Sequence, residues 1–175
     1  MKVVSINIDS ELLGRCTRGD QTAWTALVAR YERLVYSVAL TFCPHSEDAS
    51  DVFQQVWMEL YQQLSDLRHF EALPAWLITV TRRMSFKLMN SRRSSEPLDE
   101  EAPDLKEQIK HIEREHALER ALDQLPDRCR TLIDLLYFDE REPSYSQVAS
   151  IMNMPQASIG PTRARCLEKL RRILG

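Results

Sequence analysis

Two clusters of basic residues are the parts of this 175-residue sequence whose side chains are best suited to bind a ligand. One occupies residues 82–93 without any acidic residue, and the other occupies residues 163–172 with a single acid, Glu168. Two cationic clusters in separate parts of a chain are typical of a protein that contacts a polyanion at two places. Solvated helix faces would leave the same pattern, so charge alone does not separate the two interpretations. The clusters consist of Arg82, Arg83, Lys87, Arg92 and Arg93, and of Arg163, Arg165, Lys169, Arg171 and Arg172.

The second cluster belongs to a pattern that is typical of a helix-turn-helix. Ser144 and Gln147 fit a capping box, which predicts a short helix directly after them. Asn153 tolerates the left-handed conformation that ends a helix, and Ser158 is a candidate cap for a last helix that runs to about Leu174. The last helix is polar and basic in its first turns, so it is suited to enter the major groove of DNA. A helical hairpin inside a core is the alternative.

Apolar residues that recur every three or four positions predict helices along most of the chain. Such repeats cover residues 24–38, 49–64, 77–88 and 109–122, and a shorter one covers residues 132–136. Residues 94–104 contain two prolines and five acids, a composition that predicts a linker rather than a packed core. We therefore expect an all-α protein of two small helical domains, residues 1–93 and 105–175, joined by a flexible acidic linker over residues 94–104.

The sequence has none of the residue patterns expected of an enzyme or a metal site. It contains no Ser/His/Asp, Cys/His, HExxH or phosphate-loop arrangement, and its histidines have no ligand spacing. The cysteines lie far apart without a CxxC pair, which favours four reduced, mostly buried thiols over a zinc site or a disulfide framework. We therefore expect no catalytic residue, no metal and no cofactor. These side chains are His45, His69, His111 and His116, and Cys16, Cys43, Cys129 and Cys166.

The distribution of apolar residues along the sequence does not predict a membrane protein. No apolar run approaches the roughly 20 residues that a bilayer span needs. Residues 1–10 contain one lysine and no long apolar core, unlike a secretory signal. We therefore expect a cytoplasmic protein without a membrane segment.

Taken as an ordered set, the motifs resemble the extracytoplasmic-function (ECF) sigma factors of bacterial RNA polymerase, in the sigma-70 family. Gly19-Asp20, the aromatic residues after it, and residues 48–57 and 75–82 are similar to sigma region 2. Residues 121–126, 145–154 and 158–165 onward are similar to sigma region 4. The resemblance covers most of the chain and implies a factor that directs core RNA polymerase to promoter DNA. It implies that region 2 binds the β′ clamp helices and the −10 element, and region 4 the β flap and the −35 element.

The resemblance also implies roles for individual residues. Core-polymerase binding falls on Asp48, Asp51, Gln54, Gln55, Val56 and Trp57. Contact with the −10 element falls on a base-capturing loop with Arg68, His69 and Phe70, and on a helix with Trp76, Arg82, Arg83 and Lys87. For Trp76, plain core packing is the alternative. Contact with the −35 element falls on Ser158, Thr162, Arg163, Arg165 and Lys169.

Two departures from the family pattern concern charge. The family usually has an acid where this chain has Ser50 and another where it has Gln55, and the usual Asn and Asp of the −10 helix correspond to Arg83 and Lys87. Phosphorylation at Ser50, or at Ser46 or Thr41, would add about −1.5 to −2 charge and restore an acidic surface. A Ser/Thr kinase is therefore one hypothetical regulatory partner and an anti-sigma factor another, while a neutral substitution at Ser50 is the alternative.

Other functions stay open at this point. A stand-alone helix-turn-helix regulator would bind DNA without binding core polymerase. A helical adaptor would use its basic clusters to bind acidic protein. Residues 48–57 distinguish the first of these from a sigma factor, because a stand-alone regulator needs them only for packing.

Overall fold

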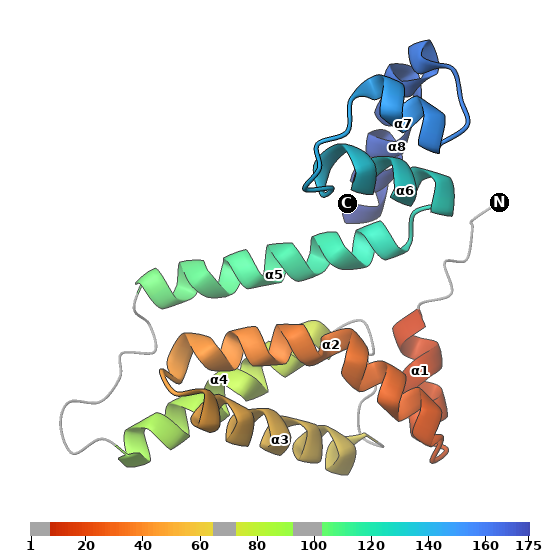
Figure 1. The fold of residues 1–175 in the computed structure, drawn as a ribbon. Helices are drawn as coiled ribbons and strands as arrows, with labels where there is room; N and C mark the ends of the chain where they lie inside the picture. The colour runs from red at the N-terminus through yellow and green to blue at the C-terminus, as the bar shows by residue number, and fades with distance from the viewer. Residues whose placement is uncertain (1–7, 65–72, 93–102) are drawn as a thin grey trace. The chain divides into compact units, whose positions relative to one another are not determined.

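A computed structural model describes residues 8–64, 73–92 and 103–175, and every regular element in these ranges is a helix (Figure 1). The chain divides into two compact units, one that ends at Glu113 and one that begins at Arg114. The expected all-α class with two helical units is confirmed.

The first unit is built around three long helices that pack against one another. These are α2 (Gln21–Phe42), α3 (Ser46–Gln63) and α4 (Leu73–Arg92), and α1 (Ile8–Cys16) packs against α2. The beginning of α5 (Pro103–Asp123) also belongs to this unit, since Ile109 lies in the same buried cluster. The apolar periodicity of each helix supplies one face of the core. Its fully buried members include Leu13, Leu27, Tyr31, Val38, Val52, Leu60, Leu73 and Leu77.

The start of α2 shows how local sequence fixes a helix boundary. Gly19 has a φ of 81°, which glycine adopts without a steric penalty and which ends the turn after α1. Asp20 then caps α2, because its carboxylate accepts hydrogen bonds from the backbone amides of Thr22 at 2.9 Å and Ala23 at 3.1 Å.

The second unit consists of short helices around a smaller core. It contains α6 (Asp127–Tyr137), α7 (Tyr145–Ile151), the 3-10 helix η2 (Gln156–Ser158) and α8 (Ile159–Leu174). The helices α6, α7 and α8 all contact one another, and η2 contacts both α7 and α8. The most deeply buried side chains are Leu132, Val148, Ile159 and Cys166.

The helix-turn-helix predicted in this unit is present as α7, η2 and α8. Ser144 and Gln147 form the expected capping box. Asn153 has a φ of 48°, the left-handed conformation expected of it, and the next amide, Met154, donates to the carbonyl of Ala149 at 3.0 Å. The role expected of Ser158 is wrong in detail, since its side chain makes no capping hydrogen bond and the residue ends η2 in helical conformation.

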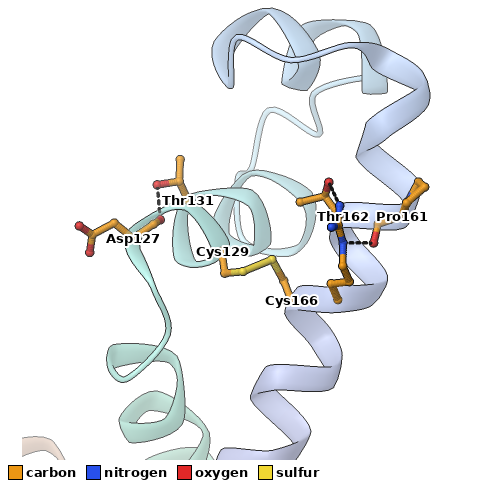
Figure 2. The surroundings of a disulfide bond; sticks show 7 residues. Asp127, Cys129, Thr131, Pro161, Thr162 and Cys166 are labelled. Atoms are coloured by element: carbon orange, nitrogen blue, oxygen red, sulfur yellow. Dashed lines mark hydrogen bonds between the residues drawn. A yellow bond between two sulfur atoms is a disulfide. The ribbon is translucent and has the colours of Figure 1, made fainter.

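The prediction of four reduced thiols is wrong for two of them. Cys129 and Cys166 form a disulfide between α6 and α8, with their Cα atoms 5.3 Å apart (Figure 2). No local pattern predicts this pairing, because 37 positions separate the two residues and only the helix packing brings them together. Cys16 and Cys43 are free and buried, as expected.

The expected domain limits differ from the observed division. Residues 94–102 of the expected linker lie outside the described ranges, and Pro103 and Asp104 already belong to α5. The division between Glu113 and Arg114 falls inside α5, whereas the sequence placed the second domain from residue 105 onward.

Candidate functional site

One exposed polar face lies along α3 in the first unit. Asp51, Gln54, Gln55 and Met58 are exposed on it. They recur at three- and four-residue spacing, so they share one side of the helix. The opposite side is occupied by buried residues such as Val56, which is fully buried.

Ion pairs link α3 to α4 at two places along the helices. The Asp48 carboxylate, whose side chain is only 3% exposed, pairs with the Arg92 guanidinium. The same guanidinium lies 3.8 Å from the carboxylate of Asp51, which is 56% exposed. Farther along the two helices, Glu59 of α3 pairs with Arg83 of α4. These contacts link the start of α3 to the end of α4, and the second half of α3 to the middle of α4.

Aromatic rings pack between α2 and α3. Trp57 makes edge-on contacts with Trp24, at a centroid distance of 6.1 Å, and with Phe53, at 5.8 Å. Trp24 also contacts Tyr61 at 5.5 Å, and Phe53 contacts Tyr36 at 6.2 Å. Edge-on pairs of this kind stabilise packing beyond the burial of area alone. The cluster therefore fixes the orientation of α3 on α2.

The exposed face of α4 carries part of the first basic cluster. Thr79, Arg83 and Lys87 are exposed at intervals of four residues, while Arg82 and Trp76 are half-buried beside them. The groove between α3 and α4 has a volume of about 550 Å³. Its lining consists of Gln55, Glu59, Arg83, Met84, Lys87, Leu88 and Ser91.

A second groove, in the C-terminal unit, brings four residues of α8 and its start together. Ser158, Thr162, Arg165 and Lys169 all line this groove, whose volume is about 460 Å³. Arg165 donates to the Pro161 carbonyl at 3.4 Å and to the Thr162 hydroxyl at 3.3 Å, which holds its guanidinium against the first turns of α8. Arg128 of α6 lines the opposite side, together with Met154, Pro155 and the two disulfide cysteines.

Comparison with known proteins shows which family the chain belongs to. The family profile of sigma-70 region 2 matches residues 27–94. The ECF RNA polymerase sigma-E factor of Escherichia coli K12 is 30% identical over 173 residues, which cover 90% of this chain and 87% of that protein. The chain belongs to the ECF RNA polymerase sigma factors. The RNA polymerase sigma-H factor of Pseudomonas aeruginosa is 28% identical over 178 residues, with 90% of this chain and 87% of that protein covered. A solved structure of CnrH in complex with the cytosolic domain of CnrY is 22% identical, covers 96% of this chain and 97% of that chain, and has a TM-score of 0.43.

The residues predicted on α3 of this sigma factor fall into two groups. Asp51, Gln54 and Gln55 lie on the exposed face, where a partner can reach them. Asp48, Val56 and Trp57 are buried, so their side chains support the helix rather than its surface.

The residues predicted to contact DNA in the sigma factor also fall into groups. Arg83 and Lys87 line one groove, whereas Arg68, His69 and Phe70 lie outside the described residues. On α8, Arg163 departs from the other predicted residues, since it does not line their groove and donates to the Tyr145 hydroxyl of α7 at 2.8 Å.

Arg128 is the groove residue that sequence reasoning missed. It follows Asp127 in the first turn of α6, thirty residues before the predicted contact surface begins at Ser158. The only sequence signal was a basic residue two positions after Pro126, at the start of a predicted helix. Its position opposite α8 depends on how the two helices pack.

The described residues of the sigma factor contain no candidate for a membrane-spanning helix or a metal site. No described helix combines the length and the apolar character needed to cross a lipid bilayer. Among the described side chains, no three or more of His, Cys, Asp and Glu gather as metal ligands would.

Proposed function

We propose that this sigma factor binds core RNA polymerase through the exposed face of α3 and directs it to promoters through α4 and α8. The observation that carries the proposal is the α8 groove. Four predicted −35 residues line it in a helix-turn-helix, and the chain as a whole matches sigma factors over nine-tenths of its length. An exposed polar and basic face at the start of a recognition helix is suited to DNA contact.

For core binding, we assign the contacts to Asp51, Gln54 and Gln55, with the β′ clamp helices of the polymerase as their partner. Their exposure on one side of α3 supports this assignment. We assign a supporting role to Asp48, which pairs with Arg92, and to Val56 and Trp57, which pack in the core. A buried carboxylate that is paired fixes a helix end, and it is not available to an external cation.

For the −10 element, we assign phosphate or base contacts to Arg83 and Lys87 on the exposed face of α4, with Arg82 and Trp76 beside them. Arg68, His69 and Phe70 keep the base-capturing role that the family resemblance implies. Arg83 is paired with Glu59, so contact with DNA requires that this exposed ion pair be exchanged for a phosphate. The exchange costs little, because exposed pairs contribute about 0–1 kcal/mol.

For the −35 element, we assign contacts to Ser158, Thr162, Arg165 and Lys169. Arg163 acts instead by holding α7 against α8 through Tyr145. In the proposed domain division, residues 105–175 carry the region 4 functions, with the β flap of the polymerase as their expected partner. Residues 1–93 carry the region 2 functions, and residues 94–104 join the two domains.

Regulation by phosphorylation is a proposal on the N-terminal half of α3. Ser50 donates to the Ser46 carbonyl at 2.8 Å, and Thr41 of α2 donates to the Ser37 carbonyl at 3.1 Å. A phosphate on Ser50 or Ser46 would lie near the positive end of the helix dipole and would add negative charge beside Asp51. Core binding by Ser50→Glu and Ser50→Ala variants tests this idea, and equal binding by both would contradict it. A Ser/Thr kinase or an anti-sigma factor would supply the regulation.

The decisive experiment is transcription in vitro from a promoter library with purified core enzyme and the purified chain. We expect initiation from a restricted set of promoters that share −35 and −10 elements. A chain that binds duplex DNA but does not bind core polymerase in a pull-down would instead be a stand-alone helix-turn-helix regulator.

A further inference from the structure

The disulfide between Cys129 and Cys166 is a feature that the proposed function does not use. It joins α6 to α8 across 37 positions of sequence and lies within the second core. Cys129 is 7% exposed and Cys166 is 1% exposed. Cys166 directly follows Arg165, so the sulfur on the inner side of α8 and the guanidinium on its outer side come from adjacent residues.

The disulfide is nevertheless accessible from one direction. Both cysteines line the groove of about 460 Å³ that holds Ser158, Thr162 and three cationic side chains. The cations are Arg128, Arg165 and Lys169, and no acidic side chain is among the described residues that line this groove. Cationic walls raise the local concentration of anionic reagents and favour the thiolate form of a cysteine.

The other two cysteines offer an internal comparison. Cys16 and Cys43 are buried in the first unit, and burial raises the pKa of both thiols. A raised pKa disfavours the thiolate, which is the nucleophile in disulfide exchange. The surroundings of Cys129 and Cys166 differ because they combine proximity to each other with a cationic groove.

We propose that Cys129 and Cys166 form a reversible redox site, which an anionic low-molecular-weight disulfide of the glutathione type oxidises through the cationic groove and the corresponding thiol reduces. In oxidation, the Cys129 thiolate attacks the reagent's disulfide, forms a mixed disulfide and releases one reagent thiol. The Cys166 sulfur then attacks the Cys129 sulfur and releases the second reagent thiol. The two cysteines lose two electrons and two protons, and the reagent gains both to become two thiols.

The redox state has a structural consequence because the second unit is small. A cross-link that closes a long loop restricts the unfolded chain, and small cores benefit most from such a link. Oxidation therefore stabilises the packing of α6 on α8, and with it the position of Arg128 opposite Arg165. Reduction removes the cross-link, so the packing of α6 on α8 becomes less stable.

The first test is a redox titration of the full chain. The protein is equilibrated in buffers with different ratios of reduced to oxidised glutathione, and free thiols are alkylated and located by peptide mass spectrometry. We expect Cys129 and Cys166 to change from two thiols to one disulfide together, while Cys16 and Cys43 stay reduced throughout. Melting temperature should fall by several degrees in the reduced form, because the cross-link is lost. Four free thiols at every ratio would overturn the proposal.

The second test examines the route through the groove. The rate of oxidation by oxidised glutathione is compared with that by the neutral bis(2-hydroxyethyl) disulfide. We expect Arg128→Gln to slow the first reaction several-fold and to leave the second unchanged. The matched control is Arg172→Gln, which removes an exposed charge of α8 that does not line the groove. Equal slowing by both variants, or by neither, would overturn entry through the groove.

The third test separates the two sulfurs. In a Cys166→Ala chain, Cys129 should accumulate as a mixed disulfide with glutathione, because no second cysteine displaces the reagent. In a Cys129→Ala chain, Cys166 should be modified at least several-fold more slowly, since it is only 1% exposed. The wild-type titration decides the proposal even if one variant folds poorly. Equal modification of the two variants would contradict the assigned order of attack.

Discussion

The two aspartates of α3, Asp48 and Asp51, lie three residues apart and have different surroundings. Asp48 is buried against Arg92, and Asp51 is exposed. We predict that Asp48→Asn lowers the free energy of unfolding by about 1–3 kcal/mol, since a buried charge-assisted hydrogen bond is weakened. Asp51→Asn should leave stability unchanged and weaken core-polymerase binding. Urea unfolding and a core-binding titration measure the two effects, and a loss of stability in Asp51→Asn alone would contradict the division.

Arg165 is one of the α8 residues to which we assign −35 contact, and its guanidinium donates to the Pro161 carbonyl and the Thr162 hydroxyl. We predict that Arg165→Ala weakens binding of the −35 duplex by about 1–3 kcal/mol if the side chain contacts a base. Binding to duplexes with an intact and a scrambled element is the measurement, with Arg172→Ala as the control on the same helix. An equal loss on both duplexes would identify a phosphate contact instead.

At this scale the sequence predicts residue sets better than residue roles. The family resemblance assigned Gln54, Gln55 and Trp57 together to core-polymerase binding, although only the two amides are exposed and Trp57 packs against Trp24 of α2. It likewise grouped Arg163 with Arg165, although the spacing of two residues places them on different sides of α8. The disulfide was missed for the same reason, since tertiary contact joins positions that no local pattern connects.

Among the elements, the N-terminus of α2 depends on the charge of a single side chain. The pKa of the Asp20 carboxyl lies well below its ordinary value of 3.8, because the Thr22 hydroxyl, the Ala23 amide and the Arg15 guanidinium all donate to the carboxylate. A lowered pKa in the folded state means that the stabilisation is complete above the ordinary value. It is lost as pH falls through the folded value.

We therefore predict that wild-type protein is more stable than Asp20→Asn at pH 7, and that the difference shrinks as pH falls below about 4. Denaturant unfolding across this range measures it. A neutral asparagine can still cap the helix but does not pair with Arg15, so the variant isolates the ionised form. A difference that stays constant down to pH 2.5 would show that ionisation of Asp20 contributes nothing.

The first helix of the helix-turn-helix, α7, is only seven residues long and depends on its cap. We predict that Ser144→Ala destabilises the second unit by about 1 kcal/mol, because the amide of Gln147 loses its acceptor. Ser144→Asp, which keeps an acceptor, should be close to wild type. Ser150→Ala serves as a control for loss of an exposed hydroxyl on the same helix, since Ser150 donates to the Ser146 carbonyl and not to the cap. Thermal unfolding measures the change, and equal effects of Ser144→Ala and Ser150→Ala would argue against the cap.

Element identity was largely predictable because the determinants are local. Apolar periodicity predicts α2, α3 and α4, and the capping box and Asn153 predict the limits of α7. Boundaries failed where neighbouring structure decides them. Ser158 lies in the extra 3-10 turn η2 instead of capping α8, and α5 begins within the expected linker because its first turns pack with the first unit.

For the whole molecule, the net charge of −3 conceals two basic clusters that are suited to contact a polyanion. Acidic residues concentrate in residues 96–123, which contain ten acids and four bases, while the two basic clusters lie on either side. Binding that depends on local cations is predicted to weaken as salt is added, with a slope that counts phosphate contacts. Two weak contacts on one chain also reinforce each other when both reach the same promoter, since the second binding event becomes intramolecular.

Cys129 and Cys166 line the same groove as the α8 residues to which we assign −35 contact. Oxidation of the two cysteines and binding of the duplex are therefore expected to be coupled. We predict that the oxidised full chain binds a −35 duplex at least about five-fold more tightly than the reduced chain, because the cross-link holds Arg128 opposite Arg165. Since coupling is reciprocal, bound duplex should stabilise the disulfide against reduction and slow attack by a thiol reagent on the covered groove. Fluorescence anisotropy in both redox states measures the first effect, with Cys129→Ala expected to show no redox response. Equal affinity of the two wild-type forms would contradict the coupling. A chain that changes redox state without binding duplex in either form would retain the redox site and contradict the proposed role of α8.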